Sequence, residues 1–176
     1  MYINYSFRSF ERKDTDRVRK FILSQNLGYP KYDTWGNKAV GQVVSGEKQA
    51  ILAYSDGYLV GDVIFQEHRQ LDRFIEIKNM RVHPDLRMRD FGRFMEKQVE
   101  RYAVSLGYNA LICDIREDKP EIVCFFVGIG FIPVATLSLY EEDKKDVTLV
   151  KFLRNLGNEK QELIERVHSV IHTATF

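Results

Sequence analysis

Residues 87–94 of this chain read RMRDFGRF and combine residue types that bind anions. Three arginines, Arg87, Arg89 and Arg93, can donate charge-assisted hydrogen bonds to phosphate oxygens. Gly92 lacks a side chain, so backbone amides beside it can approach an anion closely, and a helix start there adds the favourable end of the helix dipole. The alternative is a solvated, arginine-rich first turn of an amphipathic helix.

Asp90 is the residue of this stretch that opposes an anion. Its carboxylate would repel a phosphate if it pointed inward. A carboxylate at a helix start is nevertheless favoured by the dipole, and it can turn outward to pair with a neighbouring arginine. The stretch therefore predicts a phosphate site in which Asp90 decides how tightly the anion is held.

The surrounding pattern places this stretch between a strand and a helix. The segment QAILAYSDGYLVGDVIFQEHRQLDRFIEIKNMRV predicts three strands joined by short turns. Apolar residues spaced by three or four then predict a helix that ends at Gly107. Residues 108–115 are apolar enough for a buried, parallel strand.

The flanking regions predict further helices and strands. A strand is expected over residues 2–10, and Asp14 is expected to cap a helix that reaches about Leu27 before Gly28 and Pro30. Residues 31–48 fit a short helix or an ordered loop equally well. Further along the chain, the pattern predicts a helix over 119–129, a strand over 131–140, a charged hairpin tip over 141–146, a strand over 147–153 and a helix to about residue 172. Helices that interleave with strands in this order indicate a mixed sheet.

Length and composition indicate one soluble domain. The 176 residues carry a formal net charge of +1, with mixed charges along the chain, so binding to nucleic acid is not expected. Residues 122–140 are uncharged, but glycines and a proline near their centre favour a buried helix, a turn and a strand over a membrane span. The first residues lack the apolar region of a secretory signal, so a cytoplasmic protein is expected.

The two cysteines, Cys113 and Cys124, have no metal-ligand spacing and provide no disulfide framework. Cys124 is expected to pack within an apolar helix rather than to act as a nucleophile. No metal is expected.

Three segments together resemble a known family. Residues 82–92, VHPDLRMRDFG, resemble motif A of the GCN5-related N-acetyltransferase (GNAT) superfamily, in which a strand ending in V-x-P leads into R/Q-x-x-G-x-G/A and a helix. Residues 125–131, FFVGIGF, resemble the family's helix-to-strand junction, and residues 149–153, LVKFL, its closing strand. The resemblance implies an α/β (α+β) fold with a mixed, mostly antiparallel central sheet flanked by helices, here with an extra C-terminal helix.

The resemblance implies acetyl-CoA as the acetyl donor and an amine as the acceptor. The amides from Arg89 to Arg93 would face the pyrophosphate, and the strand from Met80 to Val82 would hydrogen-bond the pantetheine arm in a gap between splayed parallel strands. The expected donor-binding residues are Met80, Arg81, Val82, Arg87, Met88, Arg89, Asp90, Phe91, Gly92, Arg93 and Phe126.

Glu76 is the candidate general base. An amine must be neutral to attack a thioester, so a base or a water chain is useful. Glu76 lies eleven residues before Arg87, an offset similar to that of the catalytic glutamate in histone-acetylating members. The alternative is a sheet-face glutamate paired with Lys78 or Arg73. His83, the other titratable group nearby, is more typical of a loop residue.

The sequence departs from the family pattern at three positions. Asp90 replaces the first motif glycine, and Lys119 stands near an asparagine that contacts CoA in many members. Phe126 replaces a tyrosine that protonates the departing thiolate; Tyr140 or Tyr108 would substitute only if the fold brings one of them to the site. The alternative function is a catalytically degenerate module that binds CoA or a protein partner without turnover.

The resemblance covers roughly residues 2–153. A GNAT-like domain is expected over residues 1–156, and residues 157–176 are expected to form a helical extension. Its apolar face, Leu163, Val167 and Ile171, would pack on the sheet of the same domain or form a homodimer surface. The acceptor would enter beside the first helix and residues 29–46, where Tyr29, Tyr32 and Trp35 would form walls or pack.

Overall fold

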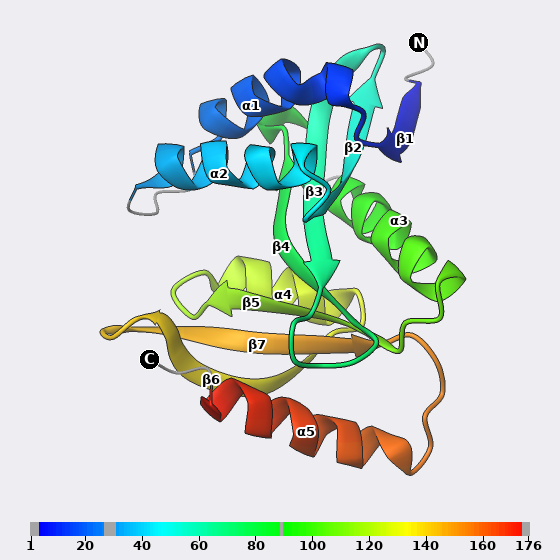
Figure 1. Ribbon diagram of the computed structural model, residues 1–176, viewed down its shortest axis with the longest axis vertical. Coiled ribbons are helices and arrows are strands. Elements are labelled where there is room, and N and C mark those ends of the chain that lie inside the picture. Colours follow the sequence, from blue (N-terminus) through cyan, green and yellow to red (C-terminus); the bar gives the residue numbers. More distant parts are fainter. Residues whose placement is uncertain (1–3, 27–30, 89, 174–176) are drawn as a thin grey trace. The chain divides into compact units, whose positions relative to one another are not determined.

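A computed structural model describes residues 4–26, 31–88 and 90–173 of the chain (Figure 1). Its backbone contacts divide the chain into two compact units. The first unit contains residues 1–66 and 77–101, and the second contains residues 67–76 and 102–176. Within the described residues, no helix is long and apolar enough to cross a membrane.

The helices and strands alternate in the order expected for a mixed α/β fold. The first unit contains β1 (Tyr5–Ser9), the 3₁₀ turn η1 (Arg12–Asp14), α1 (Thr15–Ser24), α2 (Tyr32–Val44), β2 (Gln49–Ser55) and most of β3 (Tyr58–Glu67). Strand β4 (Phe74–Val82) and helix α3 (Phe91–Ser105) each contribute to both units, and the 3₁₀ turn η2 (Pro84–Leu86) lies between them in sequence. The second unit continues with β5 (Ala110–Arg116), α4 (Pro120–Gly128), β6 (Ile132–Glu141), β7 (Lys144–Phe152) and α5 (Glu159–Thr173).

Strand pairing confirms a mixed, mostly antiparallel seven-stranded sheet in the order β1-β2-β3-β4-β5-β7-β6. Strands β1 and β2, β2 and β3, β5 and β7, and β6 and β7 pair antiparallel. The predicted parallel strand is β5, which pairs with β4 from Phe74 opposite Ala110 to Glu76 opposite Ile112.

The core of the first unit lies between α1, α2 and one face of β2 and β3. Val18 and Ile22 of α1 pack with Val40 of α2, and with Leu52 and Ile64 of the strands. Residues 31–48, which fitted a helix or a loop, therefore contain α2, because its apolar residues at helical spacing cover the sheet. Tyr32 belongs to this core, and its hydroxyl donates to the carbonyls of Ile22 and Gln25.

The core of the second unit lies beneath α5. Val167 and Ile171 of α5 pack on Phe74, Ile112 and Val150 of the sheet, with Leu163 partly buried against them. This apolar face therefore packs on the sheet. The homodimer remains a prediction. The single domain over residues 1–156 also remains a prediction.

Four local expectations differ from the structure. Asp14 precedes α1 but does not cap it through its side chain, because its carboxylate binds the Arg8 guanidinium and the Glu11 amide instead. The expected stop at Gly28 and Pro30 lies outside the described residues, and α1 already ends at Ser24.

The charged tip over 141–146 is shorter than expected, because β6 runs to Glu141 and β7 begins at Lys144. The ion pair between the Lys144 ammonium and the Glu141 carboxylate, at 2.5 Å, extends the pairing through the charged residues. The expected buried helix over 119–129 is α4, but Phe126 is its buried residue and Cys124 is exposed. The packing role expected for Cys124 is therefore wrong, because this helix exposes Ile122 and Val127 together with Cys124.

Candidate active site

The backbone between η2 and α3 takes two left-handed residues. Met88 has φ 59° and Asp90 has φ 56°. Aspartate is among the few non-glycine residues that adopt this region readily, because its short polar side chain can bond locally. A turn that favours glycine at position 90 thus also accepts Asp90. The Asp90 side chain is exposed, and Met88 is fully exposed.

The first amides of α3 have no carbonyl partners within the helix. The Phe94 amide donates to the Asp90 carbonyl at 3.1 Å, which is the first bond of the helix. The amides of Phe91, Gly92 and Arg93 precede it, so helix geometry gives them no carbonyl within the helix. This turn therefore offers the amides and the dipole end that an anion needs.

Phe91 fixes the start of α3 on the sheet. Its ring is buried and meets Tyr5 edge-on at 5.0 Å between ring centroids, and Phe7 at 5.7 Å. Gly61 of β3 allows the same helix to approach closely, because a Cβ at that position would lie 2.6 Å from the Met95 sulfur. The position of the first turn of α3 is thus set by packing against β1 and β3.

The three arginines of the stretch have different surroundings. Arg87 folds back, and its Nε donates to the Val82 carbonyl at 3.0 Å while Nη2 donates to the Gln25 side chain at 3.4 Å. Arg93 is exposed on the first turn of α3. Arg89 lies outside the described residues. Of the two described arginines, Arg93 is therefore the one placed to add charge beside the amides of this turn.

Buried and half-buried residues alternate along β4, as the sequence predicts. Glu76, Lys78, Met80 and Val82 are half-buried, and the residues between them are buried. The half-buried face includes Met80 and Val82, two of the three residues whose backbone was expected to bond the pantetheine arm.

Arg81 points into the first unit. Its Nη1 lies 3.4 Å from the Asp62 carboxylate, to which the Asn79 amide also donates at 2.8 Å. The Arg81 guanidinium lies over the rings of Tyr32 and Trp35. Burial raises the pKa of Asp62, while Arg81 and Asn79 oppose that rise. The Arg81 side chain is therefore directed into the first unit, where its Nε and Nη2 have no hydrogen-bond partner among the described residues.

Glu76 lies in the second unit on the paired part of β4, opposite Ile112. Burial raises the pKa of Tyr140 above its usual range, and the nearby negative charges of Asp114 and Glu76 raise it further. Glu76 is thus close enough to Tyr140 for its charge to act there.

Asp114 of β5 organises this group of side chains. Thr148 donates to its Oδ1 at 2.6 Å, and the Tyr140 hydroxyl donates to its Oδ2 at 3.1 Å. Tyr140 is still 57% exposed, so the hydroxyl is oriented and reachable. With its proton directed at Asp114, the Tyr140 oxygen offers lone pairs to a hydrogen-bond donor such as an amine.

The other sequence candidates occupy structural positions. The Phe126 ring is buried and packs edge-on against Phe125 and Phe131. His83 accepts from the Asp85 amide at 3.4 Å, as a loop residue does. Tyr108, just before β5, donates its hydroxyl to Glu67. Of the two substitute tyrosines, Tyr140 is the one beside the charge of Glu76.

The sequence did not single out Asp114, Thr148 or Asp62. One signal was available for the first and the last, because each is a carboxylate within an otherwise apolar strand, LICDIR for Asp114 and LVGDVIF for Asp62. A charged residue in such a strand needs a partner. Thr148 has no comparable signal, since its partner becomes known only from the pairing of β5 with β7.

Comparison with known proteins identifies the family. Residues 14–131 match the model of the acetyltransferase (GNAT) family. The fold is similar to that of the Escherichia coli ribosomal-protein-S18-alanine N-acetyltransferase, with TM-score 0.72, 14% identity, and coverage of 88% of this chain and 97% of that one.

Two further solved structures are similar to this chain. A GNAT-family protein from Desulfovibrio desulfuricans gives TM-score 0.76 and 15% identity over 86% of this chain and 100% of that one. An aminoglycoside 6′-N-acetyltransferase complexed with coenzyme A gives TM-score 0.72 and 16% identity over 87% of this chain and 99% of that one. The family match covers more than half of the sequence, and this chain therefore belongs to the GNAT acetyltransferase family.

Proposed function

We propose that this protein is an acetyl-CoA-dependent N-acetyltransferase that moves an acetyl group directly to an amine. The observation that carries the proposal is the first turn of α3, whose Phe91, Gly92 and Arg93 amides follow two left-handed residues. Backbone amides at a helix start, with an arginine beside them, suit the pyrophosphate of CoA. Solved relatives include an N-acetyltransferase in complex with coenzyme A, which supports the same donor.

The residues of this chain would divide the work of donor binding. The α3 amides would hold the pyrophosphate, with Arg93 adding charge. The backbone of Met80–Val82 would bond the pantetheine arm. Arg87 would act indirectly, because its hydrogen bond to the Val82 carbonyl fixes the end of that strand.

The transfer itself needs one proton to be removed from the amine. The amine nitrogen attacks the thioester carbonyl, a nitrogen–carbon bond forms, and the carbon–sulfur bond breaks with its electron pair on sulfur. We assign the amine proton to the Glu76 carboxylate, directly or through water. Phe126 has no proton to give, so the thiolate would leave unassisted and take its proton from water.

Tyr140 would bind the acceptor amine rather than protonate the thiolate. Its raised pKa keeps the hydroxyl protonated at neutral pH, and its proton is directed at Asp114. The free lone pairs of the Tyr140 oxygen would then accept a hydrogen bond from the acceptor nitrogen. Asp114 and Thr148 would be positioning residues for Tyr140.

Calorimetry with acetyl-CoA, followed by thiol release across a panel of primary amines, tests the proposal. We expect binding to the full chain and thiol release with at least one amine. Absence of binding at millimolar acetyl-CoA would overturn the donor assignment. Binding without thiol release for any amine would favour the alternative, a module that holds CoA without turnover.

A further inference from the structure

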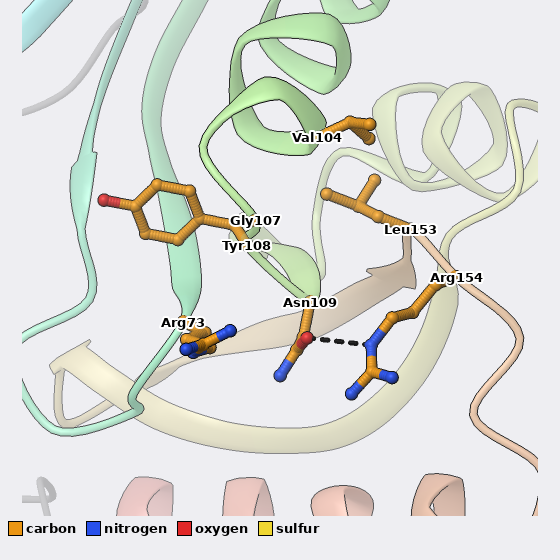
Figure 2. A pocket seen from close by; sticks show the side chains of 7 residues that line it. All are labelled: Arg73, Val104, Gly107, Tyr108, Asn109, Leu153 and Arg154. Atoms are coloured by element: carbon orange, nitrogen blue, oxygen red, sulfur yellow. Dashed lines mark hydrogen bonds between the residues drawn. The ribbon is translucent and has the colours of Figure 1, made fainter.

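A hollow lies in the second unit, just before β5 (Figure 2). It encloses about 380 Å³, which is within the usual size of small-molecule sites. Its lining residues come from the end of α3, the segment between α3 and β5, the turn before β4 and the two residues after β7. They are Arg73, Val104, Gly107, Tyr108, Asn109, Leu153 and Arg154. None of them has a place in the proposed transfer reaction.

The backbone of Asn109 joins three of these segments. Its amide donates to the Arg73 carbonyl at 2.8 Å, and its carbonyl accepts from the Leu153 amide at 2.9 Å. The hollow is therefore built on fixed main chain, rather than on a free loop.

The polar end of the hollow consists of hydrogen-bond donors. The Arg154 Nε donates to the Asn109 Oδ1 at 2.9 Å, so the amide nitrogen of Asn109 is left as a donor. Figure 2 shows this nitrogen on the side of Arg73, with the two guanidinium groups on either side of the amide. Arg154 also meets Glu159 at 3.2 Å, whereas Arg73 has no ion-pair partner within the described part of the chain. One positive charge here is thus uncompensated.

Arg73 also holds an unusual backbone conformation, with φ 58°. A long side chain in the left-handed region is uncommon and strained, and such strain gathers at binding sites. A glycine would adopt this conformation without strain, but it would not supply the unpaired guanidinium that lies beside the Asn109 amide.

The other end of the hollow is apolar. Val104 and Leu153 lie together at this end in Figure 2, and Val104 is 53% exposed. Tyr108 adds its ring, and its hydroxyl is held by Glu67. Burial together with the Glu67 carboxylate raises the pKa of Tyr108 to about 12, so Tyr108 adds no negative charge near neutral pH.

We propose that this hollow binds a small amphiphilic anion, with a phosphate or carboxylate group on Arg73, Asn109 and Arg154 and an apolar body against Val104 and Leu153. Among the described lining residues, none carries a carboxylate that would repel such a ligand. The guanidinium groups would bind the anionic oxygens through charge-assisted bonds. The ligand would bridge the turn before β4, the segment between α3 and β5 and the two residues after β7.

Titration of the full-length chain with phenyl phosphate, inorganic phosphate and benzyl alcohol tests the proposal by calorimetry and by amide chemical shifts. We expect phenyl phosphate to bind at least about tenfold more tightly than either other compound, because only it has both the charge and the apolar body. The shifts should centre on Tyr108 and Asn109. Equal affinity for phenyl phosphate and either other compound would overturn the proposal.

Matched variants separate this hollow from general attraction of anions. Arg73→Gln should weaken phenyl phosphate binding by about tenfold, as expected for the loss of a charged hydrogen bond. Val104→Glu should abolish it without lowering the melting temperature, since Val104 is half exposed. Arg166→Gln, at an exposed position of α5, is the control and should leave the affinity unchanged. Equal effects of Arg73→Gln and Arg166→Gln would overturn the proposal.

Arg93→Gln distinguishes the hollow from the donor-binding turn. Because Arg93 lies on the first turn of α3 and does not line the hollow, this variant should bind phenyl phosphate as the wild type does. Loss of binding in Arg93→Gln but not in Arg73→Gln would place the phosphate at the donor site and overturn the proposal. Failure of acetyl-CoA to bind would leave the hollow unaffected, so the two functions fail separately.

Discussion

Asp90 is the residue at which charge and backbone conformation make opposite demands. Its φ of 56° favours glycine, while its carboxylate opposes an anion at the start of α3. Asp90→Gly removes both effects. We expect acetyl-CoA affinity to be unchanged or tighter, and the free energy of unfolding to stay within about 1 kcal/mol of the wild-type value.

Asp90→Ala separates the two effects, because it removes the charge but keeps the cost of the left-handed region. This variant should unfold about 1 kcal/mol more easily than Asp90→Gly. Calorimetric titration and urea unfolding of the two variants provide the measurements. A large loss of affinity in Asp90→Gly would mean that the carboxylate organises the turn.

Glu76→Gln tests the assignment of the general base. The amide cannot take a proton, so kcat/KM should fall by roughly 100-fold or more at neutral pH. The fall of the rate toward acid pH that belongs to the Glu76 carboxyl should also disappear from the pH–rate profile. Glu117→Gln, on an exposed residue of the same unit, is the control. An unaltered profile in Glu76→Gln would remove Glu76 from the mechanism.

At the scale of elements, the packing of α3 on β3 depends on Gly61. A Cβ there would lie 2.6 Å from the Met95 sulfur and 3.0 Å from the Arg81 carbonyl oxygen. Gly61→Ala should therefore lower the free energy of unfolding by about 1–3 kcal/mol through overpacking.

Gly41 provides the matched control in the same unit. It lies inside α2, and a Cβ there would meet nothing within 4 Å. Gly41→Ala should stabilise by roughly 0.5–1 kcal/mol, because glycine is a poor helix former. Urea unfolding compares both variants. Equal effects at the two positions would show that α3 does not depend on the close approach at Gly61.

Helices and strands were predictable from the sequence where apolar residues recur with a regular spacing. The three strands from Gln49 onward, the helix after the RMRDFGRF stretch and the parallel strand β5 are confirmed. Helix α4 shows the limit of that reasoning. Its apolar residues predicted burial, but Ile122, Cys124 and Val127 are exposed. Composition alone does not say which face of a short apolar helix meets the core.

The candidate site was predictable in part for a similar reason. The donor turn and Glu76 lie on one continuous stretch of sequence, where the residue types allowed an anion-binding turn and the resemblance to the family implied the donor and the base. Asp114, Thr148 and Tyr140 lie on three different strands, and only the pairing of β5 with β7 and β6 with β7 assembles them. A hydrogen-bonded set of this kind has no signature along the chain.

At the scale of the whole molecule, acid stability depends in part on a buried carboxylate of the first unit. Two nitrogens of Arg8 each lie 2.7 Å from an oxygen of Asp14, and Tyr54 bonds both residues. These bonds, led by that to Arg8, lower the pKa of Asp14 from 3.8 to about 2. A pKa lowered by folding means that the native state holds its proton less tightly than the unfolded chain does.

The stabilising contribution of this pair is therefore present above pH 4 and is lost as the pH falls from about 4 to about 2. Because the Arg8 side chain is 34% exposed, solvent screening limits the contribution to the order of 1 kcal/mol. Asp14→Asn should flatten the pH dependence of stability in that range, and Asp16→Asn, at an exposed carboxylate, should not. Unfolding free energies measured at pH 2.5 and pH 6 provide the comparison. The same slope in wild type and Asp14→Asn would contradict the assignment.

The left-handed backbone at position 90 also bears on how such a turn changes over generations. Codons for aspartate and glycine differ at a single base, and both residues tolerate φ near 56°. A lineage can therefore exchange one for the other in one step without passing through a chain that folds poorly. If the proposed donor site is correct, selection at this position would then act on the binding of the anion rather than on folding.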